Sequence, residues 1–229
     1  MSPSTRRFLA LDVFRGMTIA FMIIVNSPGS WSYAYDPLEH AAWHGFTPTD
    51  LVFPSFLFAV GAAMSFSLDK FKGHPGLEVT FHILKRTALL FLLGFLMYWY
   101  PFFRVSDSLE ISAFPLSETR ILGVLQRIAL CYGLAALSIW FLGQKVTYIL
   151  AGLGLFVYWG ILLAFGVPGD PFSMTGNAGL HVDLALFGEA HLYHGEGMAF
   201  DPEGLLSALP AFANVIAGYA LGKHLQQRG

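Results

Sequence analysis

A polar loop near the N-terminus carries the residue types best suited to chemistry. His40, His44 and Asp50 lie between two apolar stretches, LDVFRGMTIAFMIIVN (11–26) and LVFPSFLFAVG (51–61). Ionisable groups at the mouth of a membrane helix cost free energy, which makes them functional candidates. With an unperturbed pKa near ~6.5, histidine suits either a general base or a transient acyl carrier. His40 is therefore the first candidate for catalysis, against the alternative that its ring only hydrogen-bonds a loop carbonyl.

Asp50 and the spacing of the two histidines leave alternatives open. The carboxylate of Asp50 could fix the tautomer of His40 or His44, as in a catalytic triad. It could instead complement the dipole in the first turn of the following helix, with a preceding threonine as N-cap. The i, i+4 spacing of the histidines would also permit zinc. Gly45 and the aromatic loop oppose a stable helix there, and no third ligand is suitably spaced, so we expect no metal site.

The amino-acid composition predicts that this chain lies in a membrane. Of its 229 residues, 55% are hydrophobic and only 12% are charged, and the mean hydropathy is +0.58. Soluble domains usually carry about 25% charged residues, so we expect membrane lipid as the surroundings. The formal net charge of −2 argues against a nucleic-acid partner, and the single cysteine, Cys131, excludes an intramolecular disulfide.

Apolar segments of membrane-spanning length recur along the whole chain. A bilayer core of ~30 Å needs roughly 20 mostly apolar residues per helix. We therefore predict an all-α fold: a polytopic membrane helix bundle that forms a single domain over residues 1–229. Small residues beside Gly61 predict that the second span is a tightly packed interior helix. The six predicted spans are 9–26, 50–68, 80–100, 120–142, 146–166 and 203–222.

The distribution of basic residues predicts the orientation of the bundle. Lysine and arginine gather before the first span, around the second loop, in the fourth loop and after the last span, whereas the alternate loops are rich in acid. Cytoplasmic loops carry an excess of Lys and Arg. Both termini should therefore be cytoplasmic, and the loops 27–49, 101–119 and 167–202 should face the exterior. We interpret the longest of these as a partly ordered lid over the exterior mouth.

Six motifs stand out along the chain: LDVFRG (11–16), VNSPGS (25–30), HAAWHG (40–45), TPTDLVFPSFLFAVG (47–61), RILGVLQRIALCY (120–132) and FDPEGLLSALPA (200–211). Together they resemble the catalytic region of heparan-α-glucosaminide N-acetyltransferase and its bacterial relatives. They follow the family's order and extend over nearly the whole chain. Members of that family continue for several further membrane helices, so we expect a shortened or split member in a bacterial inner membrane.

The resemblance implies a transmembrane acyltransferase that takes acetyl groups from cytosolic acetyl-CoA. The acceptor would be a sugar amine or hydroxyl on the exterior side. The family's active histidine maps onto His40, and its partner asparagine maps onto Asn26. The amide of Asn26 could donate to the thioester carbonyl or orient His40, or it could only cap its own helix.

Other residues are candidates for binding the two substrates. Arg15, Arg127, Lys85 and Arg86 are candidates for the donor's pantetheine and phosphates. The alternatives are an ion pair of Arg15 with Asp12, a structural tie by Arg127, and a plain orientation signal for the remaining two. On the exterior side, the candidates for a sugar ring are Trp43, His44 and His194.

A non-enzymatic role is the rival hypothesis. A chain that lacks the family's last helices could serve as a transporter half or a scaffolding subunit. It would then act as a homo-oligomer or together with a complementary subunit.

Overall fold

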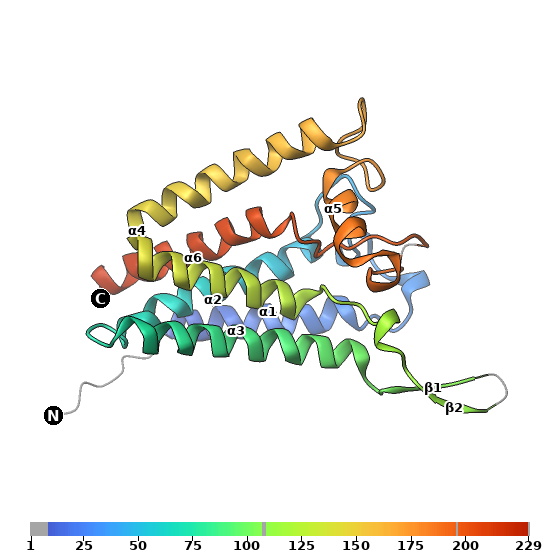
Figure 1. The fold of residues 1–229 in the computed structure, drawn as a ribbon, viewed down its shortest axis with the longest axis horizontal. Coiled ribbons are helices and arrows are strands. Elements are labelled where there is room, and N and C mark those ends of the chain that lie inside the picture. The colour runs from blue at the N-terminus through green and yellow to red at the C-terminus, as the bar shows by residue number, and fades with distance from the viewer. Residues whose placement is uncertain (1–8, 107–108, 196, 229) are drawn as a thin grey trace.

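The structure, a computed structural model, describes residues 9–106, 109–195 and 197–228. Six α-helices dominate it, which confirms the predicted all-α class (Figure 1). The α-helices are α1 (Leu9–Asn26), α2 (Val52–Asp69), α3 (Gly76–Trp99), α4 (Val124–Phe165), α5 (Ala178–Phe187) and α6 (Ala208–Arg228). Short 3₁₀ turns are η1 (Trp31–Tyr33), η2 (Asp36–Leu38), η3 (Pro48–Leu51), η4 (Leu116–Glu118) and η5 (Glu189–His191).

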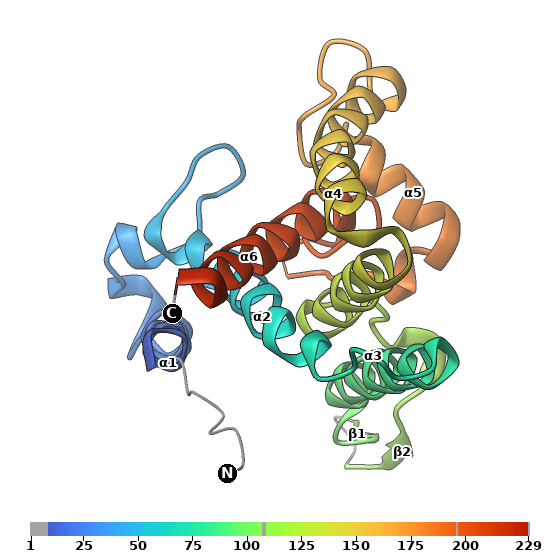
Figure 2. The ribbon, with the colours of Figure 1, turned by 90° about the vertical axis from the view of Figure 1, so that its left-hand side faces the viewer.

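Helix α2 lies at the centre of the bundle. It contacts α6 most extensively and also touches α1 and α4, while α3 packs on α4. Figure 2 shows α1 at the edge, beside α2. Of the most apolar window of α2, 44% is buried, against 11% to 17% for the corresponding windows of α1, α3 and α4. The prediction that this segment is a packed interior helix is therefore confirmed.

Glycines allow the close approach of α2 and α6. A Cβ added at Gly61 would overlap the backbone carbonyl of Val215, and one at Gly218 would overlap the carbonyl of Phe58. Without a side chain at either position, the two backbones can meet directly, which is how small residues promote helix packing in membranes. Asn214 strengthens this contact, since its amide donates to the carbonyl of Pro54 at 2.8 Å.

Helix α4 contains two of the predicted spans. Its 42 residues would reach about 63 Å if straight, roughly twice the bilayer core. The helix is broken at Gly143, which has φ 78° and ψ 169°, a backbone conformation that glycine adopts at little cost. Figure 1 shows that α4 reverses direction there, so its two arms correspond to the predicted segments 120–142 and 146–166.

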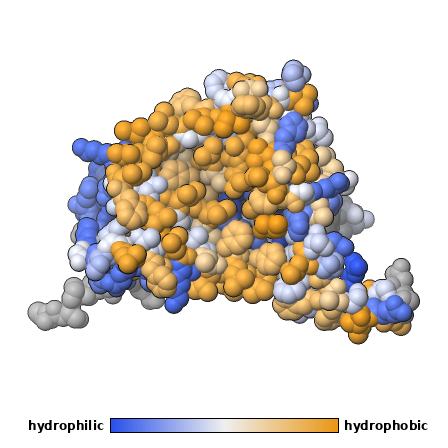
Figure 3. All heavy atoms as spheres, viewed as in Figure 1, coloured by the Kyte–Doolittle hydropathy of each residue, from blue (hydrophilic) through white to orange (hydrophobic). Residues whose placement is uncertain are grey.

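Four of the described helical segments are long and apolar enough to cross a membrane. They are 9–26, 48–69, 76–99 and 124–165, the last of which contains the kink. Helix α6 is not in this group, and it begins at Ala208, so residues 203–207 of the predicted last span are not helical. Figure 3 shows apolar side chains over the broad flank of the bundle and hydrophilic residues toward its two ends.

The two ends of the bundle differ in structure. The first residues of α1 and the last of α6 lie at one end, whereas α5 and the hairpin lie at the other (Figure 1). The hairpin consists of β1 (Phe103–Val105) and β2 (Ile111–Ala113), which are antiparallel and pair Arg104 with Ser112. The predicted exterior loops therefore share one end of the bundle. Which end is cytoplasmic stays a prediction.

Candidate active site

His40 and Asp50 form a hydrogen-bonded pair in the loop between α1 and α2. Nδ1 of His40 lies 2.6 Å from Oδ1 of Asp50. The side chain of His40 is 68% exposed, whereas that of Asp50 is only 26% exposed. A carboxylate beside Nδ1 places the ring proton there and leaves Nε2 as the basic nitrogen. The accessible edge of the ring is therefore able to take a proton from a substrate.

The carboxylate of Asp50 is also held by the backbone around it. Oδ2 accepts the amide of Thr47 at 2.8 Å and that of Ala41 at 3.4 Å. Thr47 and Asp50 form a capping box at the start of η3, which leads directly into α2. The two roles left open by the sequence are therefore compatible, because one carboxylate starts the helix and orients the imidazole.

Asn26 has a local partner in this structure. It is the last residue of α1, it is exposed, and its amide donates to the carbonyl of Met22 at 3.0 Å. Its neighbour Val25 and the residue Leu38, two before His40, both line a cavity of about 360 Å³. Neither Asn26 nor His40 is among the residues that line this cavity, and the amide of Asn26 bonds its own helix.

Trp43 joins the His40 loop to the long connection that follows α4. Its indole Nε1 donates to the carbonyl of Phe172 at 2.7 Å. Its ring meets that of Phe200 edge to face, with centroids 5.3 Å apart. Trp43 also forms one wall of a cavity of about 220 Å³ that contains Asp183 and Asp201. Of the predicted sugar-binding residues, Trp43 is the one that lines this cavity.

Arg120 anchors the segment that precedes α6. Its guanidinium donates to both carboxylate oxygens of Asp201, at 2.6 and 3.0 Å, and to Glu203 at 2.5 Å. The ring faces of Tyr98 and Tyr193 lie 5.0 and 4.8 Å from its central carbon. Burial alone would lower the pKa of Arg120, but the two carboxylates raise it above its ordinary value.

Arg127, on the first part of α4, also holds the segment that precedes α6. Its guanidinium donates to the carbonyls of Pro202 and Gly204, at 3.1 and 2.9 Å, and to the hydroxyl of Ser207. Its Nε is buried without a partner. Of the two interpretations of Arg127, these contacts fit the structural tie.

The other predicted binding residues lie apart from this region or have local partners. Arg15 is exposed on α1, and the ion pairs of the described residues do not include one with Asp12. Lys85 and Arg86 are exposed on α3, with Arg86 4.7 Å from the centre of the Tyr132 ring. His44 is exposed. The ring of His194 bonds the carbonyl of Leu192 at 3.0 Å.

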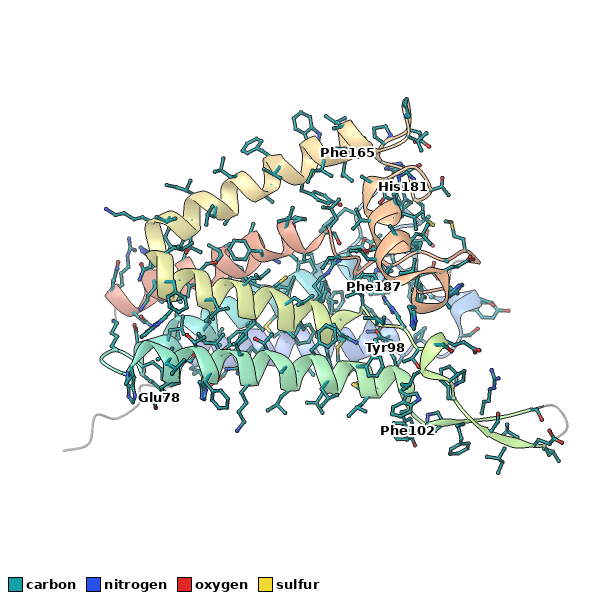
Figure 4. The ribbon with its side chains drawn as sticks, in the orientation of Figure 1. Glu78, Tyr98, Phe102, Phe165, His181 and Phe187 are labelled. Carbon is teal, nitrogen blue, oxygen red and sulfur yellow. The ribbon has the colours of Figure 1, made fainter. Side chains whose placement is uncertain are left out.

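Sequence reasoning missed the acidic cavity beside Trp43. Asp183 is 1% exposed and Asp201 is 7% exposed, although both belong to a connection predicted as a lid. One signal was available. Arg120 is a basic residue next to predicted exterior loops that are otherwise rich in acid. The motif FDPEG contains its partners, Asp201 and Glu203. Nothing in the sequence marks Asp183. Figure 4 shows α5, with His181 and Phe187, at the same end of the bundle as Tyr98.

Comparison with known proteins identifies the family. The family whose profile matches residues 7–229 is described as "Heparan-alpha-glucosaminide N-acetyltransferase, catalytic". The chain belongs to this family. The heparan-alpha-glucosaminide N-acetyltransferase of Mus musculus is 28% identical over 97% of this chain, and that of Homo sapiens is 27% identical over 98%. The chain spans about two fifths of the length of these relatives, 40% and 39% respectively.

Membership of this family, together with the structure, indicates what kind of protein this chain is. It is an integral membrane protein of an acetyltransferase family, with the helical bundle that the sequence predicts. The match covers the His40 loop, both arms of α4 and the 200–211 motif. Among the described residues, no group of three or more His, Cys, Asp or Glu side chains is arranged to hold a metal ion.

Proposed function

We propose that this chain is the reactive region of a membrane acetyltransferase. It moves an acetyl group from cytosolic acetyl-CoA to an amine or hydroxyl of a sugar on the exterior side. The observation that carries this proposal is the His40–Asp50 hydrogen bond of 2.6 Å in a loop at one end of the bundle. An oriented imidazole with one accessible nitrogen is the catalytic group that acyl transfer to a weak nucleophile requires.

The proposed reaction uses the two nitrogens of His40 differently. Nδ1–H donates to Asp50, so Nε2 takes the proton from the acceptor as the acceptor attacks the thioester carbonyl. The carbon–sulfur bond breaks, a carbon–nitrogen or carbon–oxygen bond forms, and the imidazolium returns the proton to the leaving CoA thiolate. Asp50 stabilises the imidazolium while it exists. If Nε2 attacks first, the acetyl group rests on His40 before the acceptor removes it.

Stabilisation of the oxyanion is assigned to Asn26. Its amide nitrogen carries two hydrogens, one of which donates to the carbonyl of Met22, so the second can donate to the thioester oxygen. Such a donor lowers the barrier because charge develops on that oxygen in the transition state. The donor's phosphates are assigned to Arg15, Lys85 and Arg86, whose side chains are exposed on α1 and α3. Arg127 is given no part in donor binding, since its side chain is buried and its Nη2 is already bonded to three protein oxygens.

A donor-turnover assay tests the proposal. Release of CoA from acetyl-CoA is followed with D-glucosamine as acceptor, using the purified chain in lipid nanodiscs. His40→Ala should lower the rate by about 10²-fold or more, because general base catalysis contributes 10²- to 10⁴-fold. The matched control is His181→Ala, which removes an exposed histidine on α5 at the same end of the bundle. Equal rates for wild type and His40→Ala would refute the assignment of the base.

A further inference from the structure

Two threonines at the start of η3 hold the incoming segment of the loop between α1 and α2. The hydroxyl of Thr47 donates to the carbonyl of Glu39 at 2.7 Å, and the hydroxyl of Thr49 donates to the carbonyl of Pro37 at 3.3 Å. Thr49 is only 2% exposed. A carbonyl oxygen can only accept, so both hydrogens come from the threonines. The incoming segment is therefore tied to the start of α2 by two side chains.

The hydroxyl of Thr47 also lies against the carboxylate that bonds the imidazole. Its oxygen is 3.1 Å from Oδ2 of Asp50, and the backbone amide of Thr47 donates to the same Oδ2 at 2.8 Å. A hydroxyl has one hydrogen, which it gives either to Glu39 or to Asp50 but not to both at once. Thr47 thus stands between the backbone that precedes His40 and the carboxylate that orients its ring.

The ring of His40 depends on these two attachments for its orientation. Its side chain is 68% exposed, and Asp50 is the one hydrogen-bond partner of the ring within the described part of the chain. An exposed pair is held weakly on its own, because two side chains must be ordered in water. Packing supplies little restraint to a ring that lies mostly in solvent. The position of Asp50 relative to the backbone of Glu39 therefore decides where the imidazole points.

The neighbours of Thr47 in this loop each reach one side of the arrangement. Thr49 bonds backbone only, through the carbonyl of Pro37. Ala41 reaches Asp50 through its backbone amide, at 3.4 Å. Among the hydrogen bonds of the described residues, Thr47 is the one side chain that contacts both the carboxylate of Asp50 and the backbone before His40.

Resting on the proposed function, we propose that Thr47 is a positioning residue for the acetyl transfer. Its hydroxyl keeps the backbone before His40 and the carboxylate of Asp50 at a fixed separation, so that the ring proton stays on Nδ1 and Nε2 remains free. Thr47 acts through these two residues and is given no contact with either substrate. Because Thr47 also begins the turn that leads into α2, the orientation of the base is coupled to the start of that interior helix.

Thr47→Val tests this inference, since it removes the hydroxyl and keeps the backbone amide. The kinetic readout is the release of CoA from acetyl-CoA with D-glucosamine as acceptor, in nanodiscs. The value of kcat should fall about 10- to 10²-fold, as expected for a misplaced catalytic group, while KM for acetyl-CoA should change by less than about twofold. Thr47→Ser keeps the hydroxyl and should retain most of the wild-type kcat.

The tautomer of His40 separates a positioning role from a merely structural one. In the chain labelled with ¹⁵N-histidine in detergent micelles, His40→Ala identifies the ring signals of His40, and the two nitrogen shifts report which nitrogen carries the proton. The wild type should show mainly the Nδ1–H tautomer, and Thr47→Val should show a mixture. Loss of a helix cap alone would lower stability without this change.

Thr49→Val is the matched control for the tautomer. It removes the neighbouring threonine hydroxyl, which does not reach Asp50, and should leave the Nδ1–H tautomer of His40 in place. A shift of the same size in Thr49→Val and Thr47→Val would overturn the inference, because general looseness of the loop would then explain both. If Thr47→Val does not fold, Thr47→Cys replaces it, since a thiol is a weak donor.

The remaining outcomes keep this inference apart from the proposed function. A folded Thr47→Val variant with the wild-type tautomer and the wild-type kcat would overturn the positioning role and leave His40 as the base. A wild type that releases no CoA, but whose Nδ1–H tautomer is lost in Thr47→Val, would count against the proposed catalysis alone.

Discussion

At the scale of single residues, four carboxylates at the His40 end of the bundle differ in how they are held. Asp50 is saturated by an imidazole and two backbone amides. Asp201 and Glu203 share one guanidinium. Asp183 has a backbone amide on one oxygen and nothing on the other among the described hydrogen bonds. Function is therefore expected at His40–Asp50, where the carboxylate orients an exposed imidazole.

The burial of Asp183 predicts a pH-dependent stability. Burial raises its pKa from 3.8 to about 6, and the charge of Asp201 adds to this, while the Leu205 amide and Arg127 oppose it. The folded state thus binds the proton more tightly than the unfolded state does. Its contribution to stability is full below about pH 4 and is lost as the pH rises through 6, by at most about 3 kcal/mol.

Thermal unfolding of wild type and Asp183→Asn between pH 4 and pH 8 measures this effect. The two proteins should be similar at pH 4, and the variant should be the more stable at pH 8, because it has no buried charge to form. A constant difference in melting temperature over the whole pH range would contradict the prediction.

At the scale of elements, some positions were predictable from the sequence and others depended on tertiary contacts. The apolar segments predicted the positions of α1, α2 and α3 to within a few residues, and the gap between the predicted segments 120–142 and 146–166 falls at the break in α4. The pairing of His40 with Asp50 was one of two alternatives, and the capping box showed that both hold. The start of α6 was predicted at residue 203. Arg120 and Arg127 hold residues 201–207 in an irregular conformation, and a window of hydropathy contains no signal for such contacts.

The close contact of α2 with α6 gives a sharp prediction for stability. Gly218→Ala places a methyl group on the carbonyl of Phe58, so the helices must separate. The expected loss is about 1–3 kcal/mol, typical of an overpacked core. Gly16→Ala is the control, because a Cβ at Gly16 on α1 meets nothing within 4 Å. Melting temperatures in the same detergent compare the two, and equal values would show that the helices can move apart freely.

At the scale of the whole molecule, the arrangement of the bundle predicts access from two sides. The first residues of α1 and the last of α6 lie at one end of the bundle, and the loop between α1 and α2 lies at the other (Figure 1). The single native cysteine, Cys131, is buried. Tyr35→Cys should therefore react with a membrane-impermeant maleimide added to intact cells, whereas Lys72→Cys should react only after lysis. The opposite pattern would place the candidate base on the cytoplasmic face.

Arg120 and Arg127 restrict how residues 201–207, which lie at the same end of the bundle as the His40 loop, can move. Swinging residues 201–207 outward would strip Arg120 and Arg127 of their oxygen partners at once, and breaking a buried ion pair by removing one partner costs about 3–5 kcal/mol. Residues 201–207 are therefore held rigidly in place. We expect substrates to reach His40 from the side of the 27–49 loop, where its ring is 68% exposed, without displacement of residues 201–207.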